Sequence, residues 1–137
     1  MRRELEQKAS ALGFDLCRLT SASLPPVTAE RFASWIESGA AGDMDWMGET
    51  QARRADPLTL WPQARSIIML GMNYGPQGDP LAALEKPSAA HISVYARHRD
   101  YHDIIKGRLK ELAQWLVRRT RERNLAPPDV KVFVDTA

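Results

Sequence analysis

Residues that can do chemistry are concentrated between Tyr95 and His102, where the chain reads Tyr-Ala-Arg-His-Arg-Asp-Tyr-His. These eight residues include two tyrosines, two arginines, two histidines and one aspartate. An expected strand at 91–96 leads into the segment, and an expected helix that Asp100 caps leads out of it. Because backbone amides and side chains converge on ligands at strand-to-helix junctions, the pattern predicts a binding or catalytic site.

The two histidines of this segment, His98 and His102, are four residues apart, the spacing of two metal ligands on one helical turn. Asp100 is expected to start the helix between them, so they need not share a face. No His-Glu-x-x-His pattern and no neighbouring cysteine accompanies them, so we predict no metal ligands here. A histidine that forms hydrogen bonds near a cofactor is a better interpretation, and a partly exposed histidine without such a role is a comparable alternative.

Two further residues have side chains suited to a site. Asp135 ends an expected strand at 130–135, and catalytic groups often project from strand ends in α/β folds, where an acid can donate a proton. The alternative is a turn aspartate that closes the strand. Arg54 offers a planar guanidinium fork for carboxylate, phosphate or amide oxygens. The alternative for Arg54 is a pair with Asp56 or the capping of a turn.

Apolar spacing predicts the elements that must position these residues. In the first half of the chain we expect a helix through Leu5, Ala9 and Leu12 ending at Gly13, a strand at 14–20, and a helix capped by Thr28 and ended by Gly39. Short helical turns at 42–60 and a strand at 66–74 are expected next. After a loop at 75–90 we expect a strand at 91–96, a long helix after Asp100 and a strand at 130–135. The nearly continuous apolar run at 66–74 predicts burial on both faces. The expected fold class is α/β (α+β), with a central mixed sheet flanked by helices.

Composition limits the classes of function. The chain has 137 residues, enough for one domain, and 44% hydrophobic residues, enough for a core. Its single cysteine, Cys17, excludes an internal disulfide and a cluster held by this chain's thiolates alone, and it fits a reducing cytoplasm. We find no signal peptide and no apolar run long enough for a membrane span. The net charge of +2 is too small to indicate a nucleic-acid partner.

The expected long helix carries an excess of cations. Its basic residues are Lys106, Arg108, Lys110, Arg118, Arg119, Arg121 and Arg123. Such a face could follow a phosphate backbone. We favour a solvated helix face with cations near the C-terminal end of the dipole, because the face lacks the aromatics that stack on RNA bases.

Taken in order, several segments resemble the N-terminal region of the epoxyqueuosine reductase family. The resemblance rests on Gly42-Asp-Met-Asp-Trp-Met47, Arg54-Ala-Asp-Pro57, Ala64-Arg-Ser-Ile-Ile68, Met72-Asn-Tyr74, Tyr95-Ala-Arg97, Asp100-Tyr-His102 and Val134-Asp-Thr-Ala137. His98 departs from the pattern, because glycine is usual there. The order and spacing fit over nearly the whole chain.

The resemblance implies a cobalamin-dependent oxidoreductase of queuosine biosynthesis, which reduces epoxyqueuosine to queuosine at the wobble position of tRNA. It implies a fold similar to the cobalamin-binding domain of reductive dehalogenases. Two 4Fe-4S clusters belong to the parent protein and not to this chain. We expect residues 1–137 to form an N-terminal cobalamin-binding domain, incomplete at its C-terminal end and inactive alone. The parent is expected to be a cytoplasmic monomer that binds tRNA and no membrane.

By the same resemblance, Asp135 is the proton donor to the epoxide oxygen. The candidates for the shell around the corrin and the substrate are Arg54, Tyr95, Arg97, Tyr101 and His102. One alternative is a cobalamin-binding or trafficking module without redox activity of its own. A second is a structural or RNA-contacting protein that uses the basic helix.

Overall fold

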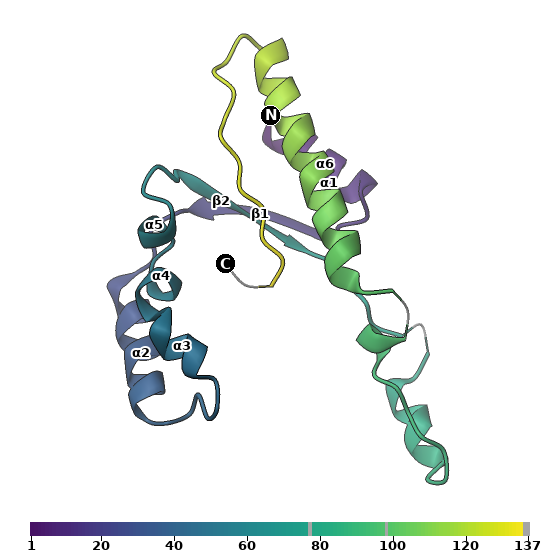
Figure 1. Ribbon diagram of the computed structural model, residues 1–137. Coiled ribbons are helices and arrows are strands. Elements are labelled where there is room, and N and C mark those ends of the chain that lie inside the picture. The colour runs from purple at the N-terminus through teal and green to yellow at the C-terminus, as the bar shows by residue number, and fades with distance from the viewer. Residues whose placement is uncertain (77, 98, 136–137) are drawn as a thin grey trace. The chain divides into compact units, whose positions relative to one another are not determined.

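The computed structural model describes residues 1–76, 78–97 and 99–135 (Figure 1). The elements in order are α1 (Arg2–Ala11), β1 (Leu16–Ser21), α2 (Pro26–Glu37), α3 (Asp45–Glu49), α4 (Gln51–Ala55), α5 (Pro57–Leu60), β2 (Ser66–Gly71), the 3-10 helices η1 (Pro80–Glu85) and η2 (Val94–Ala96), and α6 (Tyr101–Glu122). The chain divides into two compact units, one of Met1–Cys17 with Leu70–Ala137 and the other of Arg18–Met69. The expected α/β class is confirmed.

In the first unit, α1 packs against α6, although the two helices are far apart in sequence. Leu5 and Ala9 lie four residues apart on one face of α1 and are buried, as is Leu112 on α6. Phe14 and Cys17 complete the buried apolar group of this unit. The predicted apolar face of α1 is therefore confirmed at Leu5 and Ala9, and its burial brings α1 and α6 together.

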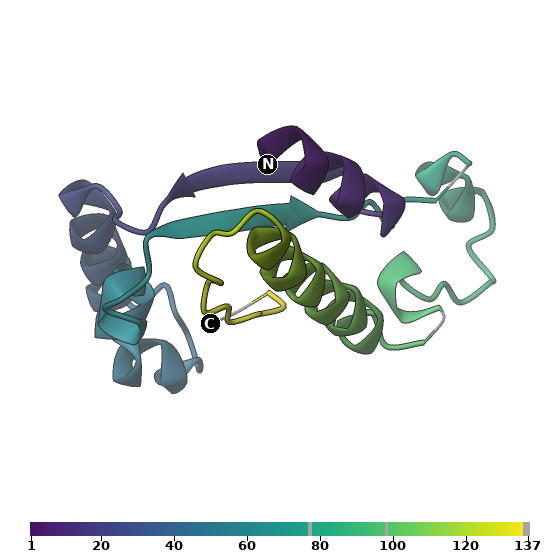
Figure 2. The same ribbon diagram turned by 90° about the horizontal axis from the view of Figure 1, so that it is seen from above.

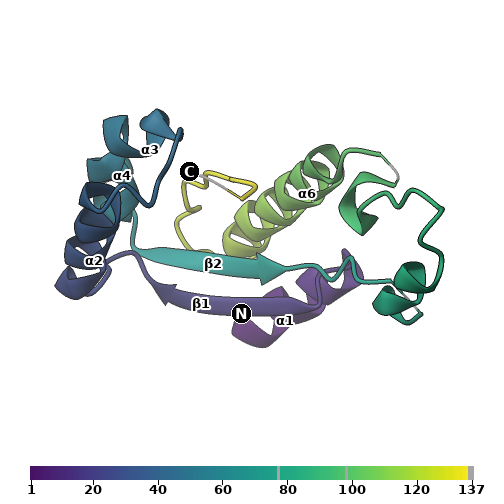
Figure 3. The ribbon, with the colours of Figure 1, turned by 90° about the horizontal axis from the view of Figure 1, so that it is seen from below.

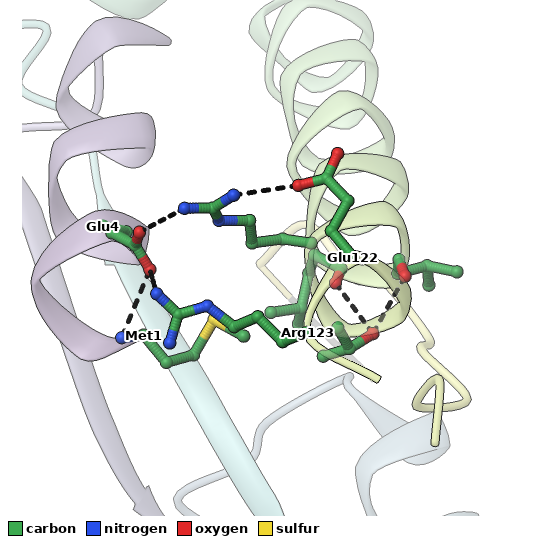
Figure 4. Close-up of polar contacts among 8 residues, drawn as sticks. Met1, Glu4, Glu122 and Arg123 are labelled. Atoms are coloured by element: carbon green, nitrogen blue, oxygen red, sulfur yellow. Dashed lines mark hydrogen bonds and ion pairs between the residues drawn. The ribbon is translucent and has the colours of Figure 1, made fainter. Parts of the chain in front are cut away.

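A polar network joins the ends of the same two helices (Figure 4). The two oxygens of the Glu4 carboxylate accept from the guanidinium of Arg119 at 2.6 Å and from that of Arg123 at 2.8 Å. The amino group of Met1 lies 3.2 Å from Glu4, and Arg119 also donates to Glu122 at 2.9 Å. These contacts fix the C-terminal half of α6 against the first turn of α1.

The sheet in the described part of the chain consists of β1 and β2, which run antiparallel (Figures 2 and 3). The amide of Asp15 donates to the carbonyl of Gly71 at 2.9 Å, so the start of one strand meets the end of the other. The predicted strand at 66–74 is confirmed over Ser66–Gly71. The prediction that both its faces are buried is wrong, since Met69 is 55% exposed.

The second unit contains α2 to α5, and α2 starts earlier than predicted. Pro25 is the N-cap and Pro26 the first helical residue, so Thr28 lies inside the helix and does not cap it. Proline suits this place because its fixed φ is helical and its missing N–H would have no partner in the first turn. The predicted end at Gly39 is confirmed by its positive φ of 74°. Short helical turns follow, as expected.

Two predicted strands are absent from the described residues. Residues 91–96 contain the 3-10 helix η2, in which the amide of Ala96 donates to the carbonyl of Ser93 at 2.9 Å. Residues 130–135 are irregular apart from a single bridge residue, Val134. A strand needs a neighbour to satisfy its backbone groups, and among the described residues these segments have no such pairing beyond the single bridge at Val134. The expected central mixed sheet is therefore a two-stranded antiparallel one in these residues.

The predicted long helix is confirmed as α6, which begins at Tyr101 after Asp100. Among the described residues, none of the helices has the length and apolar character needed to cross a bilayer.

Candidate functional site

The N-terminus of α6 is built by Asp100. Its Oδ1 accepts a hydrogen bond from the backbone N–H of His102 at 2.9 Å, which satisfies a helix amide that would otherwise have no partner. The same oxygen lies 2.8 Å from Nδ1 of the His102 imidazole. Asp100 therefore starts the helix and also holds the ring of the residue two positions later.

Asp135 approaches this helix start from the other end of the sequence. The hydroxyl of Tyr101 donates to Oδ2 of Asp135 at 2.5 Å. Nε2 of His102 lies 3.1 Å from the same oxygen. The rings of Tyr101 and His102 are stacked, with centroids 4.2 Å apart and an interplanar angle of 26°. Three residues predicted from the sequence thus form one cluster, which we call the Tyr-His-Asp cluster and define as Tyr101, His102 and Asp135.

The backbone of Asp135 has a φ of 61°, in the left-handed region. Aspartate tolerates this conformation better than most residues because its short polar side chain can form local hydrogen bonds. Such a turn directly after the bridge residue Val134 directs the carboxylate toward α6. The side chain remains 50% exposed, so a bound substrate can reach it.

Hydrogen bonding sets the protonation of the cluster. The hydrogen bond to Asp135 is the main cause that raises the pKa of Tyr101 to about 12, with partial desolvation as a further cause. The pKa of His102 is raised, chiefly by its hydrogen bond to Asp100 and also by Asp135. The pKa of Asp100 is lowered, first by the backbone N–H of His102 and then by the imidazole. Tyr101 is therefore a protonated donor at neutral pH, and the imidazolium form of His102 is favoured.

The arrangement suits proton transfer to a bound oxygen. Tyr101 and His102 both contact Oδ2 of Asp135, and neither of these two contacts involves Oδ1. A carboxyl group whose one oxygen is held by two donors has a fixed orientation, and its other oxygen can face a substrate. Orientation of this kind is the first requirement for a general acid or base.

The other predicted site residues do not join this cluster. Tyr95, on η2, is 57% exposed. Arg97 donates through Nε to the carbonyl of Ile92 at 3.0 Å. Both lie in the segment that leads into α6, close to Asp100 in sequence but outside the hydrogen bonds of Asp135 described above.

Arg54 belongs to the Arg18–Met69 unit. Its Nε donates to Oγ1 of Thr50 at 2.7 Å, and its guanidinium carbon lies 4.5 Å from the centroid of the Trp46 ring. Arg54 therefore bonds to Thr50 rather than to Asp56, whose carboxylate accepts from the amide of Leu58 as the cap of α5. Stacking of arginine on tryptophan fixes the guanidinium plane.

Sequence reasoning missed the second role of Asp100, although a signal exists. An N-cap aspartate two residues before a histidine can reach both the backbone amide and the imidazole of that residue. His98 and the terminal Thr136 and Ala137 lie outside the described residues. In the described part of the chain, no three His, Cys, Asp or Glu side chains gather closely enough to hold a metal ion.

Comparison with known proteins agrees with the order of the motifs. The family model described as "Epoxyqueuosine reductase QueG, DUF1730" matches residues 54–136. Relatives named epoxyqueuosine reductase include that of Gloeobacter violaceus, 38% identical over 82% of this chain and 34% of the relative. The relative from Leadbetterella byssophila is 33% identical over 98% of this chain and 41% of the relative. The relative from Escherichia coli is 31% identical over 98% of this chain and 34% of the relative. The chain thus spans between a third and about two fifths of these relatives' lengths. No solved structure gives a significant match.

Proposed function

Since the chain belongs to the epoxyqueuosine reductase family, we propose that it contributes the proton-donating side of an oxidoreductase that converts epoxyqueuosine in tRNA to queuosine. The observation that carries the proposal is the Tyr-His-Asp cluster, in which two donors hold a half-exposed carboxyl group. The substrate-bearing partner is tRNA with epoxyqueuosine at its wobble position.

Asp135 is the proposed proton donor. Reduction of an epoxide to an alkene expels the ring oxygen, and an alkoxide is a poor leaving group unless it is protonated. Oδ2 of Asp135 is held by Tyr101 and His102, which leaves Oδ1 to face the substrate oxygen. The exposure of the carboxyl group allows a modified nucleoside to approach it.

Cobalamin is the proposed cofactor, as the resemblance to the family implies. A corrin has flat apolar faces and a rim of amide groups, so its protein shell needs aromatic faces and hydrogen-bond donors. Tyr95 presents an exposed phenol, and Arg97 uses only Nε in its bond to Ile92. In Arg54 the bond to Thr50 likewise uses Nε. Each of these donors by itself fits amide recognition, and Tyr101 and His102 belong to the same unit as Tyr95 and Arg97.

When bound, cobalamin would supply the electrons for the reduction. The contribution of this chain's own residues is the proton from Asp135, whose carboxyl group Tyr101 and His102 orient. We propose that the fold is similar to the cobalamin-binding domain of reductive dehalogenases, consistent with its mixed α/β class.

A 4Fe-4S cluster is a different matter. Such a cluster is held by about four thiolates, and the chain has one cysteine, Cys17, which is buried. The residues of this chain do not fit such a cluster. In the proposed reaction, therefore, electrons come from outside this chain.

The structure bears on the alternative in which α6 contacts RNA. Arg119 and Arg123 pair with Glu4, and Nη1 of Arg108 donates to the sulfur of Met72 at 3.3 Å. Two cations on α6 and the Arg123 that caps its C-terminal end thus hold the first unit together, which weakens the basic face as a phosphate-binding surface.

A cobalamin-retention experiment tests the proposal. The chain is incubated with cobalamin, desalted and examined by visible absorption, and we expect it to retain the cofactor. The parent protein, loaded with cobalamin and supplied with a low-potential reductant and tRNA containing epoxyqueuosine, should convert the base to queuosine, detected by mass spectrometry of the nucleosides. Retention by the chain without conversion by the parent protein would favour the binding or trafficking module. Loss of cobalamin on desalting would contradict the cofactor proposal.

A further inference from the structure

His102 lies between two carboxylates. Its Nδ1 is 2.8 Å from Oδ1 of Asp100, and its Nε2 is 3.1 Å from Oδ2 of Asp135. A neutral imidazole has one N–H and one lone pair, so it can donate to only one of two ionised carboxylates. Only the imidazolium donates to both. When His102 is neutral and its Nδ1–H donates to Asp100, Nε2 can instead accept a hydrogen bond from the protonated carboxyl group of Asp135.

We propose that His102 replaces the proton that Asp135 delivers, and that Asp100 positions the imidazole for this transfer. The inference rests on the proposed role of Asp135 as donor to the epoxide oxygen. It assigns His102 to the acid itself rather than to the corrin shell. Neither residue changes oxidation state, because only a proton moves between them.

The transfer balances as follows. The O–H bond at Oδ1 of Asp135 breaks as the O–H bond to the substrate oxygen forms, and its electron pair stays on the carboxylate. Oδ2 then takes the Nε2 proton of the imidazolium, and that N–H electron pair stays on the ring, so that Asp135 is protonated again. Exchange with solvent at the half-exposed carboxyl group moves this proton to Oδ1 before the next turnover. His102 is left neutral, with Nδ1–H donating to Asp100. Solvent restores the Nε2 proton, because the His102 side chain is 50% exposed.

Tyr101 has a different role in the Tyr-His-Asp cluster. Its raised pKa keeps the phenol protonated through the neutral range, so it is a fixed donor to Asp135 and not a proton source. Its ring stacks on the imidazole and limits rotation of the ring. The groups that act electrostatically on this site are Asp100 from the start of α6, Asp135 from the C-terminal segment, and Tyr74 from the segment after β2.

A simple structural role for His102 makes different predictions from a proton-supplying one. If the histidine only bonds to the Asp100 cap, its tautomer and its titration are independent of Asp135. If it supplies the proton, the neutral ring carries hydrogen on Nδ1 and leaves Nε2 to exchange a proton with Asp135. Free histidine prefers the opposite tautomer, so the two roles are separable by spectroscopy.

The test is a nitrogen NMR titration of the labelled 137-residue chain. In the unsubstituted chain, the neutral form of His102 should be the Nδ1–H tautomer. In Asp100→Asn the pKa of His102 should fall and the Nε2–H tautomer should return. In Asp135→Asn the pKa should also fall, by less, because Asp100 is the larger cause. Resonances of His91 serve as the internal reference and should be the same in all variants.

An Nε2–H tautomer in the unsubstituted chain would overturn the inference, and this measurement needs no variant to fold. An unchanged His102 titration in a folded Asp135→Asn chain would also overturn it. The outcome is separate from the proposed function. If the titration of His102 depends on Asp135 but no epoxide is reduced, the proposed function is contradicted and the proton transfer between these two residues is not. If the epoxide is reduced but the titration of His102 does not depend on Asp135, only the inference is contradicted.

Discussion

The hydroxyl of Tyr101 donates to Oδ2 of Asp135 at 2.5 Å, across 34 residues of sequence. This hydrogen bond ties the first residue of α6 to the segment after Val134. It converts two residues that look unrelated in the sequence into parts of one cluster. The position of the proposed acid therefore depends on where α6 begins, and hence on the Asp100 cap.

Replacement of the Asp135 carboxyl group should change the titration of Tyr101. Because the hydrogen bond to Asp135 is the main cause that raises the pKa of Tyr101 to about 12, Asp135→Asn should lower that pKa toward the ordinary value of 10.0. The measurement is phenolate absorbance against pH, with a Tyr101→Phe chain used to subtract the other two tyrosines. Identical difference curves before and after the substitution would argue against this bond in solution.

His102 should make the chain more stable at mildly acid pH than at alkaline pH. Its pKa is raised on folding, so the contribution is fully present below the unfolded value of 6.5 and is lost as pH rises through the folded value. The stability difference between the unsubstituted chain and His102→Gln should thus be larger near about pH 5.5 than near about pH 9. Urea midpoints at the two pH values measure it, and His91→Gln is the matched control. A stability difference between the unsubstituted chain and His102→Gln that increases with pH would contradict this prediction.

Glu4 should give an acid-dependent contribution to the packing of α1 on α6. Arg119 is the main cause that lowers its pKa from 4.5 to about 2. The contribution is therefore present above 4.5 and is lost as pH falls toward about 2. Glu4→Gln should lower the melting temperature at neutral pH, and this effect should shrink in acid. Glu6→Gln, which removes only an exposed pair with Arg2, should have a smaller effect. Equal losses for both variants would refute the role of the network.

Two glycines allow the cost of a side chain to be separated from the cost of its backbone conformation. Gly13 and Gly39 both follow a helix with positive φ, 84° and 74°. A Cβ at Gly39 would meet nothing within 4 Å, whereas one at Gly13 would lie 2.7 Å from Nη1 of Arg108. Gly39→Ala should cost about 1–2 kcal/mol from φ alone. Gly13→Ala should cost more, because Arg108 must also leave its contact with Met72. Chemical denaturation measures both, and a smaller loss at Gly13 would be inconsistent with this packing.

The helices were predictable because their signals are local. The i, i+4 apolar spacing of α1, the Asp100 cap of α6 and the glycines after α1 and α2 each lie within one or two turns. The start of α2 differs from the prediction because Thr28 is a good cap by type, whereas Pro25 and Pro26 begin the helix without a side-chain cap. Strands were harder, since an apolar segment such as 91–96 pairs only if a neighbour exists, and sequence periodicity does not show one.

For the site, Tyr101, His102 and Asp135 were named from residue type and from family resemblance, and the structure brings them together. The contacts that define the site were not predictable. The bond from Tyr101 to Asp135 depends on the left-handed turn at Asp135, and Asp100 was recognised only as a cap. The roles proposed for Arg54, Tyr95 and Arg97 stay predictions.

The central claim is that Asp135 donates the proton to the epoxide oxygen. The most direct measurement is the rate of epoxyqueuosine reduction in tRNA by Asp135→Asn, compared with the unsubstituted protein at equal cobalamin occupancy. We predict unchanged retention of cobalamin and a loss of rate of about 10²–10⁴-fold, the range that general acid catalysis supplies. A normal rate in the Asp135→Asn protein would contradict the account.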